Sequence, residues 1–257
     1  MLTKPKKPEA THFYHYSSAE NLHLLEPILL KSKLYFPRPN ELNDPTEAKP
    51  KFTVPSETEL IQFMYDHYIR NRPYLSSQEC AQIKETMIAA CKSKGANYIG
   101  EIIVQYIYER TNNHRIYSMS KRFDNMSLWA NYADNHKGYC LEFKNEGLFS
   151  RAYEVKYSDE VINFDITKPD ETIGYYFFIK KRDWRSEEEI RIVTPQHFKH
   201  PIIFDSKLLT RLILGYQMSH ANKLQIIEWA EQRSTPLVVV QTKYNDFEQK
   251  LELLSIG

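Results

Sequence analysis

The sequence of 257 residues predicts an α+β fold with mixed or antiparallel central sheets and a helical insertion. Short segments with strand character are scattered among irregular helices, without the regular strand–helix alternation of a parallel α/β sheet. A block at about 56–112 has helical periodicity and separates two parts that are rich in strands. We therefore expect a single α+β domain over 11–257 that contains this insertion, preceded by a Lys/Pro-rich flexible tail over 1–10.

Glycine is scarce, and its placement excludes two common ways of holding a nucleotide. The chain has 7 glycines, and no two are separated by a single residue, as a G-x-G-x-x-G fingerprint requires. Gly95 and Gly100 have the spacing of a P-loop, but Glu101 and Ile102 follow where a lysine and a hydroxyl residue are needed. Any nucleotide would therefore be held in another way.

Charge and cysteine content favour a soluble, cytoplasmic protein. The 34 Lys and Arg residues balance 33 Asp and Glu residues, which argues against a dedicated DNA coat or a polybasic membrane binder. The 3 cysteines form no Cys-x-x-Cys motif, as expected in a reducing compartment. No apolar run is long enough to cross a membrane, so we expect no membrane partner.

Up to residue 50 the sequence predicts, in order, a strand over 11–18, a helix over 18–33, a strand over 33–39 and a loop. The first strand follows from alternating aromatic and polar residues, and prolines end the second. The helix is capped by Ser18. It is interrupted or closed near Pro27, which has no backbone N–H to donate.

The insertion carries the signals of three successive helices. Ser-x-x-Glu capping boxes begin at Ser56 and Ser76, and each precedes apolar residues at helical spacing. Gly95 is placed to end the second of these helices. A third helix is predicted over 97–109.

After residue 113 the strands return with helices among them. The predicted strands are 114–122, 138–144, 153–158, 187–195, 202–205, 211–215, 237–244 and 250–256. Helices are predicted over 173–183 and 221–233, and 124–138 is predicted to be a short helix that ends in a turn. In the turn before residue 139, Gly138 is expected to take a positive φ. Lys137 in the same turn could bind a phosphate. The alternative is that the turn only leads the chain into the next strand.

A first candidate site is His15-Tyr16-Ser17, on the first predicted strand. A histidine at a strand end can hydrogen-bond a ligand hydroxyl, and a tyrosine can stack on a ring. The alternative is a surface strand on which tyrosines flank the histidine.

Two further sets of residues are candidates for lining a cleft. Tyr35 lies on the second strand and Asn43 in the turn after it, where the alternatives are ordinary core and an Asx turn. Ser118 and Ser120 share one face of a strand, because side chains alternate with period two. Their hydroxyls could bind ribose or amide groups, and the alternative is a solvated edge strand.

The strongest candidate is the charged start of the predicted strand 187–195. Glu187, Glu189 and Arg191 alternate along the strand and so share one face. Neighbouring carboxylates repel, so burial would raise the pKa of one of them, and Arg191 would counter this. Such a group suits stabilising a developing cation or activating a hydroxyl. The alternative is a charged face exposed to solvent.

Six segments occur in an order that is specific when they are taken together. They are YHYSS (14–18), LYFPRPNELNDPTE (34–47), YSMSKR (117–122), LWANYADNHKGYCLEF (128–143), VKYSDE (155–160) and KKRDWRSEEEIRIV (180–193). With them the chain resembles the bacterial family of domain of unknown function 2971. The resemblance covers most of the chain, least of all 50–112, and the family name implies no activity.

A weaker resemblance is to ADP-ribosyltransferases, which carry a His on one strand, a Tyr or Ser-x-Ser on others and a Glu at a strand start. It implies that NAD is the substrate, that His15 matches the His, and that Glu189 or else Glu187 is the acid. The acid would stabilise the oxocarbenium-like state and orient the acceptor. The residues that the resemblance and the patterns above assign to NAD binding are His15, Tyr16, Ser17, Tyr35, Asn43, Ser118, Ser120, Lys137 and Arg191.

The resemblance thus implies transfer of ADP-ribose to a macromolecule, either nucleic acid or protein. Such an enzyme would be a bacterial toxin or phage-defence effector, with an antitoxin or immunity partner. Two other functions stay open. One is a metal-dependent nuclease with Asp44, Glu187 and Glu189 as ligands, although no compact ligand motif is present. The other is a non-catalytic binding or regulatory module that keeps the cleft.

Overall fold

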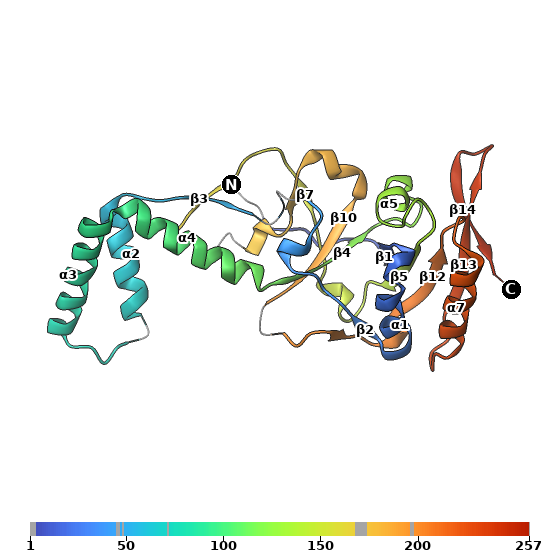
Figure 1. Ribbon diagram of the computed structural model, residues 1–257, viewed down its shortest axis with the longest axis horizontal. Helices are drawn as coiled ribbons and strands as arrows, with labels where there is room; N and C mark the ends of the chain where they lie inside the picture. Colours follow the sequence, from blue (N-terminus) through green and yellow to red (C-terminus); the bar gives the residue numbers. More distant parts are fainter. Residues whose placement is uncertain are drawn as a thin grey trace.

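The computed structural model describes residues 4–44, 47, 49–70, 72–167, 174–195 and 198–256. Figure 1 shows a body built around a large sheet and a helical arm that projects from it. From edge to edge, the 8-stranded sheet consists of β14 (Lys250–Ser255), β13 (Val238–Asn245), β12 (Leu209–Leu214), β5 (Tyr139–Lys144), β1 (His12–Ser17), β4 (Arg115–Ser120), β10 (Glu189–Thr194) and β6 (Tyr153–Glu154). Within this sheet only β12 and β13 pair in parallel, so the predicted α+β class with a mixed central sheet is confirmed.

Helices cover both faces of the sheet. Helices α1 (Leu22–Lys31) and α7 (His220–Glu231) contribute buried residues to the larger core cluster, together with Phe13, Tyr117 and Leu141 from the strands. Helix α5 (Met126–Asn131) packs on the opposite face, against side chains such as Tyr16 and Cys140. Alternation along each strand sends neighbouring residues to different cores.

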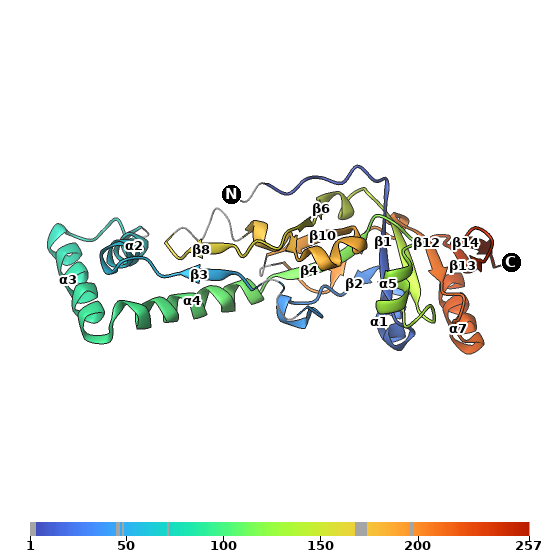
Figure 2. The ribbon, with the colours of Figure 1, turned by 90° about the horizontal axis from the view of Figure 1, so that it is seen from above.

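The arm contains the three helices that the sequence predicts. They are α2 (Glu57–Ile69), α3 (Ser77–Lys94) and α4 (Ala96–Asn112). Both capping boxes are formed, and Gly95 follows α3 with a φ of 85°. The arm has a core of its own, and no helix among the described residues is long and apolar enough to cross a membrane. Figure 2 shows the arm extending along the long axis of the molecule.

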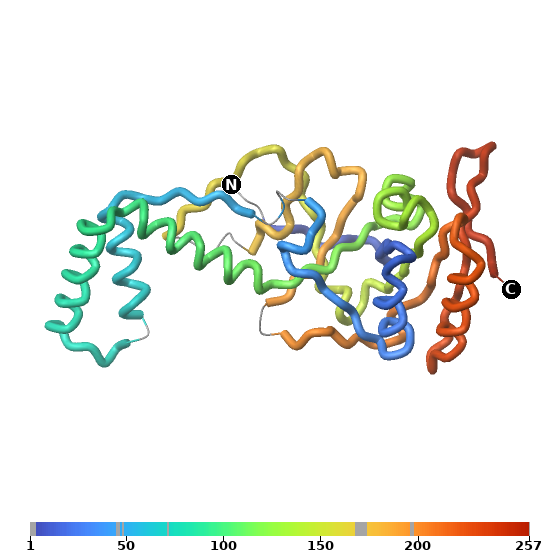
Figure 3. The backbone as a smooth tube through the Cα atoms, viewed as in Figure 1, coloured from blue at the N-terminus to red at the C-terminus, as the bar shows by residue number. Residues whose placement is uncertain are grey.

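Two short strands connect the arm to the body, and the sequence pattern did not indicate them. Strand β3 (Lys51–Thr53) enters the arm, and β8 (Asn163–Asp165), which is far away in the sequence, pairs with it in parallel. Figure 3 shows the two segments running side by side toward the arm. The insertion is therefore held by residues from two separate parts of the chain.

Helix α1 passes through Pro27 without ending there. Leu25, Ile28 and Leu29 on either side of the proline are buried in the core. Burying such side chains stabilises the fold by about 2 kcal/mol each, which outweighs the backbone hydrogen bond that Pro27 cannot make. The expected interruption is therefore wrong for a reason that lies in tertiary packing.

The predicted helix over 173–183 is also largely wrong. Residues 174–176 form one helical turn, Ile173 lies outside the described residues, and β9 (Ile179–Lys180) pairs in parallel with β7 (Lys156–Tyr157). Phe177 and Phe178 are both buried, so apolar periodicity does not distinguish a helix from a strand here. A 3₁₀ helix, η4 (Arg182–Glu187), then leads into β10.

The remaining elements are short. They are β2 (Lys33–Leu34) paired with β11 (Ile202–Ile203), and the 3₁₀ helices η1 (Ala19–Asn21), η2 (Pro39–Glu41), η3 (Phe149–Arg151) and η5 (Ser206–Leu208). Residues 4–10, predicted to belong to a flexible tail, lie against the body, where the Glu154 amide donates to the Lys6 carbonyl at 2.9 Å. Residues 1–3 lie outside the described part of the chain.

The turn before β5 differs from the prediction in which residues take positive φ. Asp134, Asn135 and His136 have φ values of 46°, 49° and 66°, and Gly138 does not share this conformation. Glycine is needed at 138 because a Cβ there would lie 2.1 Å from the carbonyl oxygen of Ser17. The expectation of a positive φ at Gly138 is wrong, and close backbone packing explains this glycine.

Candidate functional site

The carboxylates of Glu187 and Glu189 meet at the ammonium group of Lys180. The Nζ atom of Lys180 lies 2.6 Å from Glu187 Oε2 and 3.1 Å from Glu189 Oε2. Glu187 ends η4, so its expected place on the strand is wrong. Glu188 between them has a φ of 46°, and this turn lets both carboxylates reach the same cation.

Arg191 and Glu47 complete the group. Arg191 donates from Nε to Glu189 Oε1 at 2.6 Å, from Nη2 to Glu189 Oε2 at 2.7 Å, and from Nη1 to the Phe177 carbonyl at 2.7 Å. Arg191 Nη2 also donates to Glu47, whose second oxygen lies 3.8 Å from Lys180 Nζ. We call Glu47, Lys180, Glu187, Glu189 and Arg191 the acidic cluster; each is 1–5% exposed.

Negative charge is in excess in the acidic cluster, where three carboxylates surround two cations. Burying an unpaired negative charge costs free energy, so the pKa of a carboxyl group in such a cluster rises. Burial, together with the charge of Glu187, raises the pKa of Glu189 to about 7 against the opposing effect of Lys180. Burial lowers the pKa of Arg191 to about 9, and the charge of Asp44 opposes this.

A chain of hydrogen bonds connects the acidic cluster to the surface. The Tyr132 hydroxyl, just after α5, donates to Glu187 Oε1 at 2.7 Å and accepts from the Asn43 side chain at 2.9 Å. Asn43 is exposed, whereas Glu187 is buried. Burial raises the pKa of Tyr132, so the hydroxyl stays protonated and able to donate. The chain of hydrogen bonds from the exposed Asn43 therefore ends at the carboxylate of Glu187 and not at that of Glu189.

Neighbouring strands position the two acids. The Ser120 hydroxyl donates to the Glu187 carbonyl at 2.7 Å, and the Glu189 amide donates to the Tyr157 hydroxyl at 2.8 Å. Ser118 is opposite Arg191 in the β4–β10 register, and its side-chain hydrogen bond to Glu189 works against the raised pKa of that carboxyl. The shared face predicted for Ser118 and Ser120 is therefore the face that carries the acidic cluster.

His15 lies on the opposite face of the sheet. Tyr14 is paired with Ser120, which is paired with Glu189, so these three side chains share one face and His15 points to the other. There its ring stacks on Tyr117 with a centroid separation of 4.4 Å, and Nδ1 is 2.8 Å from the Ser118 carbonyl oxygen. Burial lowers the pKa of His15. The structure does not bring His15 and Glu189 into one cleft.

Four other predicted site residues are placed apart from the acidic cluster. Tyr16 donates to the Arg122 carbonyl at 2.7 Å and packs on Trp129, while Ser17 is buried on the face that carries His15. Tyr35 is 41% exposed and its hydroxyl bonds Glu41. Lys137 makes an exposed ion pair with Asp134 at 3.8 Å.

The predicted site residues that the structure gathers around one centre are Asn43, Ser118, Ser120, Glu187, Glu189 and Arg191. The final set of predicted site residues does not include Glu47, Lys180, Tyr132 or Tyr157, although the motifs that were considered contain Glu47 and Tyr132. The sequence carries one signal for Lys180: it directly follows the apolar Phe177-Phe178-Ile179, and a lysine buried beside such a run needs a charged partner.

The carboxylates that a metal-dependent nuclease would use are engaged by protein cations. Glu187 and Glu189 each bind Lys180, and Asp44 acts electrostatically on Arg191. Within the described ranges, no group of three or more His, Cys, Asp and Glu side chains is arranged to hold a metal ion. Nothing in the described residues therefore favours a metal centre.

Comparison with known proteins bears on the segment that carries most of the site. The model of the family described as "Protein of unknown function (DUF2971)" matches residues 128–192. No curated protein and no solved structure matches the chain. Over residues 128–192 the chain is similar to the DUF2971 family, so the resemblance to this family is confirmed for that segment. The segment contains every member of the acidic cluster except Glu47.

Proposed function

We propose that the protein transfers ADP-ribose from NAD to a macromolecule and that the acidic cluster is its catalytic centre. The observation that carries this proposal is the excess of buried carboxylate at the end of the Asn43–Tyr132–Glu187 chain. When the bond between ribose and nicotinamide loosens, positive charge develops on the ribose. A carboxylate held in a site of low dielectric lowers the energy of that state.

In this proposal Glu187 is the catalytic acid and Glu189 positions it. Glu189 is bound through both oxygens to Arg191 and through one to Lys180, so its carboxylate is fully engaged. Glu187 Oε1 is held by Tyr132, which is itself held by the exposed Asn43. Displacing Tyr132 would open a path to Glu187, and the nicotinamide ring could then stack on the tyrosine.

The proposal departs from the pattern of ADP-ribosyltransferases most clearly at the histidine. His15 faces the other side of the sheet, so it has no role in holding the ribose. Ser118 and Ser120 carry the hydroxyl groups nearest to the acids along β4. We assign ribose binding to this strand face.

The test is release of nicotinamide from NAD by the purified full chain, with candidate acceptors of protein and nucleic acid present. Glu187→Gln keeps the shape of the side chain and removes its charge. Glu142→Gln is the matched control, because Glu142 is also a buried glutamate of the sheet but pairs with Arg211 at 3.3 Å instead of joining the acidic cluster. Equal release by wild type and Glu187→Gln would remove this assignment. Absence of release by the wild type would favour the non-catalytic binding module.

A further inference from the structure

The exposed side of η4 carries an aromatic ring and several cations next to the acidic cluster. Residues 181–186, Lys-Arg-Asp-Trp-Arg-Ser, are exposed or half-buried and include three cations and one carboxylate; we call them the η4 surface. We propose that the η4 surface binds single-stranded nucleic acid, with a base stacked on Trp184 and phosphates held by Lys181 and Arg185. The proposal deepens the function proposed above by naming the acceptor, and it rests on that function for this step alone.

The first argument is the position of Trp184 relative to the acidic cluster. Side chains three residues apart eclipse each other in a 3₁₀ helix, so Trp184 and Glu187 lie in one row of η4. Both contact the same ammonium group, because Lys180 Nζ lies 4.9 Å from the centroid of the Trp184 ring and 2.6 Å from Glu187 Oε2. A base stacked on Trp184 would therefore lie close to the proposed catalytic acid.

The second argument is that part of the Trp184 ring remains accessible. The side chain is half-buried, and its contact with Lys180 holds the ring in place before a ligand arrives. Of the 3 tryptophans, Trp129 is fully buried and Trp229 packs against the larger core cluster. A partly exposed, fixed aromatic ring suits a nucleobase of any identity, because every base has a π face.

The third argument is the charge around the ring. Arg182 and Arg185 share the next row of η4, and Lys181 directly precedes the helix. Among the residues that the structure describes, Lys181 and Arg185 form no ion pair. Arg182 meets Asp159 at 3.7 Å, where the two side chains are 64% and 61% exposed, so this pair is solvated and weak. Asp183 is the one carboxylate of the η4 surface, and phosphates would find an excess of cations there.

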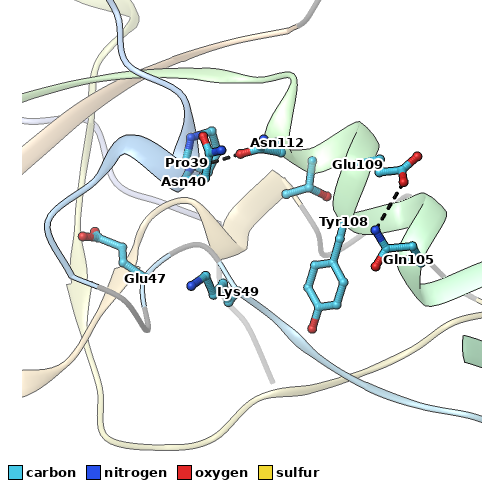
Figure 4. A pocket seen from close by; sticks show the side chains of 9 residues that line it. Pro39, Asn40, Glu47, Lys49, Gln105, Tyr108, Glu109 and Asn112 are labelled. Atoms are coloured by element: carbon cyan, nitrogen blue, oxygen red, sulfur yellow. Dashed lines mark hydrogen bonds between the residues drawn. The ribbon is translucent and has the colours of Figure 1, made fainter.

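The pocket at the root of the arm is less suited to a polyanion. It has a volume of about 470 Å³ and lies between α4 and the segment around η2. Figure 4 shows Glu47 and Lys49 on one side of it and Glu109 of α4 on the other. Two carboxylates against one ammonium group would repel a phosphate. The balance of charge therefore favours the η4 surface over this pocket.

The test is a titration of fluorescently labelled oligonucleotides with the full chain in the absence of NAD, observed by fluorescence anisotropy. The probes are single strands of thymidine or of uridine, about 12 nucleotides long, which is within the usual site size of such binders. An abasic strand of the same length keeps the phosphates without the bases, and a DNA duplex keeps its bases paired.

We expect saturable binding of a single strand at about 50 mM salt, and binding at least about tenfold weaker for the abasic strand and for the duplex. Binding of the thymidine strand alone identifies DNA as the source of the ligand, and binding of the uridine strand alone identifies RNA. Absence of saturable binding of either single strand at about 100 µM protein would overturn the proposal, as would equal binding of the abasic strand.

The variant Trp184→Leu keeps an apolar side chain over Lys180 and removes the stacking surface. Its affinity for the single strand should fall about tenfold, whereas its affinity for the abasic strand should not change. A misfolded protein would lose both, so the abasic strand separates lost stacking from lost structure. Trp229→Leu is the matched control, since Trp229 is also a half-buried tryptophan on a helix. Equal affinity of wild type and Trp184→Leu for the single strand would overturn the proposal.

The salt dependence tests the phosphate contacts. Arg185→Ala should reduce the slope of log Kd against log salt by about 0.7, the effect of one lost contact to a single strand. Lys49→Ala is the control, because Lys49 is also exposed but lines the pocket instead. A smaller slope in Lys49→Ala and not in Arg185→Ala would place the strand in the pocket and overturn the proposal. Because NAD is absent, these results are independent of those for nicotinamide release.

Discussion

Glu187 and Glu189 are separated by one residue with a φ of 46°, and their carboxylates bind the same lysine ammonium at 2.6 and 3.1 Å. The turn at Glu188 brings two like charges together inside the protein. Lys180 and Arg191 compensate them only in part, because Glu47 adds a third carboxylate. The stability of this centre, its dependence on pH and its proposed chemistry all follow from that imbalance.

Lys180→Met should destabilise the fold by about 3–5 kcal/mol, because it leaves the buried carboxylate of Glu187 without a cation. The measurement is the free energy of unfolding from urea titration. Lys137→Met is the control, since Lys137 is exposed and its ion pair with Asp134 is solvated; a change within about 0.5 kcal/mol is expected there. Similar losses in the two variants would show that the acidic cluster is not a closed, desolvated network.

The contribution of Glu189 to stability should fall as the pH rises between about 4.5 and 7. The pKa of Glu189 is raised from 4.5 to about 7 in the folded protein, so in this range the folded chain holds a proton that the unfolded chain releases. Above about pH 7 the loss is complete, at roughly 1–3 kcal/mol. Unfolding measured at pH 5, 6, 7 and 8 should show the wild type losing stability relative to Glu189→Gln as the pH rises, because the other titrating groups contribute equally to both proteins. Identical slopes would contradict the raised pKa.

Tyr132→Phe should lower the free energy of unfolding by about 1–3 kcal/mol, because Glu187 Oε1 loses its donor while it stays buried. Tyr74→Phe provides the comparison: Tyr74 is 76% exposed and its hydroxyl is solvated, so no measurable change is expected. Thermal unfolding of both variants beside the wild type is sufficient. Unchanged stability of the Tyr132→Phe variant would mean that water replaces the hydroxyl and that Glu187 is more open than the structure indicates.

Gly138→Ala should cost at least about 2–3 kcal/mol or prevent folding, since its Cβ would lie 2.1 Å from the backbone oxygen of Ser17. Gly174→Ala introduces the same methyl group where no atom lies within 4 Å, and it should leave the stability nearly unchanged. Soluble expression and the unfolding midpoint of the two variants decide this. A tolerated Gly138→Ala would contradict the close approach of β1 to the turn before β5.

The parts of the structure that local chemistry determines were accessible from the sequence. The capping boxes at Ser56 and Ser76 form as predicted, because they need only residues three positions apart. Alternation along β10 placed Glu189 and Arg191 on one face, and the structure confirms it. Pro27 shows the limit, since long-range burial decides whether α1 continues past it.

The composition of the acidic cluster could not be predicted in the same way. Lys180 reaches Glu189, and Glu47 reaches Arg191, only because β9 and the segment after η2 fold over β10. The position of His15 required knowledge of register as well: its strand was predicted, but its face depends on the pairing of Tyr14 with Ser120. Alternation shows which residues of a strand share a face, and the pairing of strands shows which faces coincide.

The rate of nicotinamide release from NAD decides whether Glu187 acts within the acidic cluster as proposed. We expect release by the wild type, a fall of about 10²–10³-fold in Glu187→Gln, and no comparable fall in the folded Glu142→Gln control. Release that is equally fast in wild type and in a folded Glu187→Gln variant would contradict it.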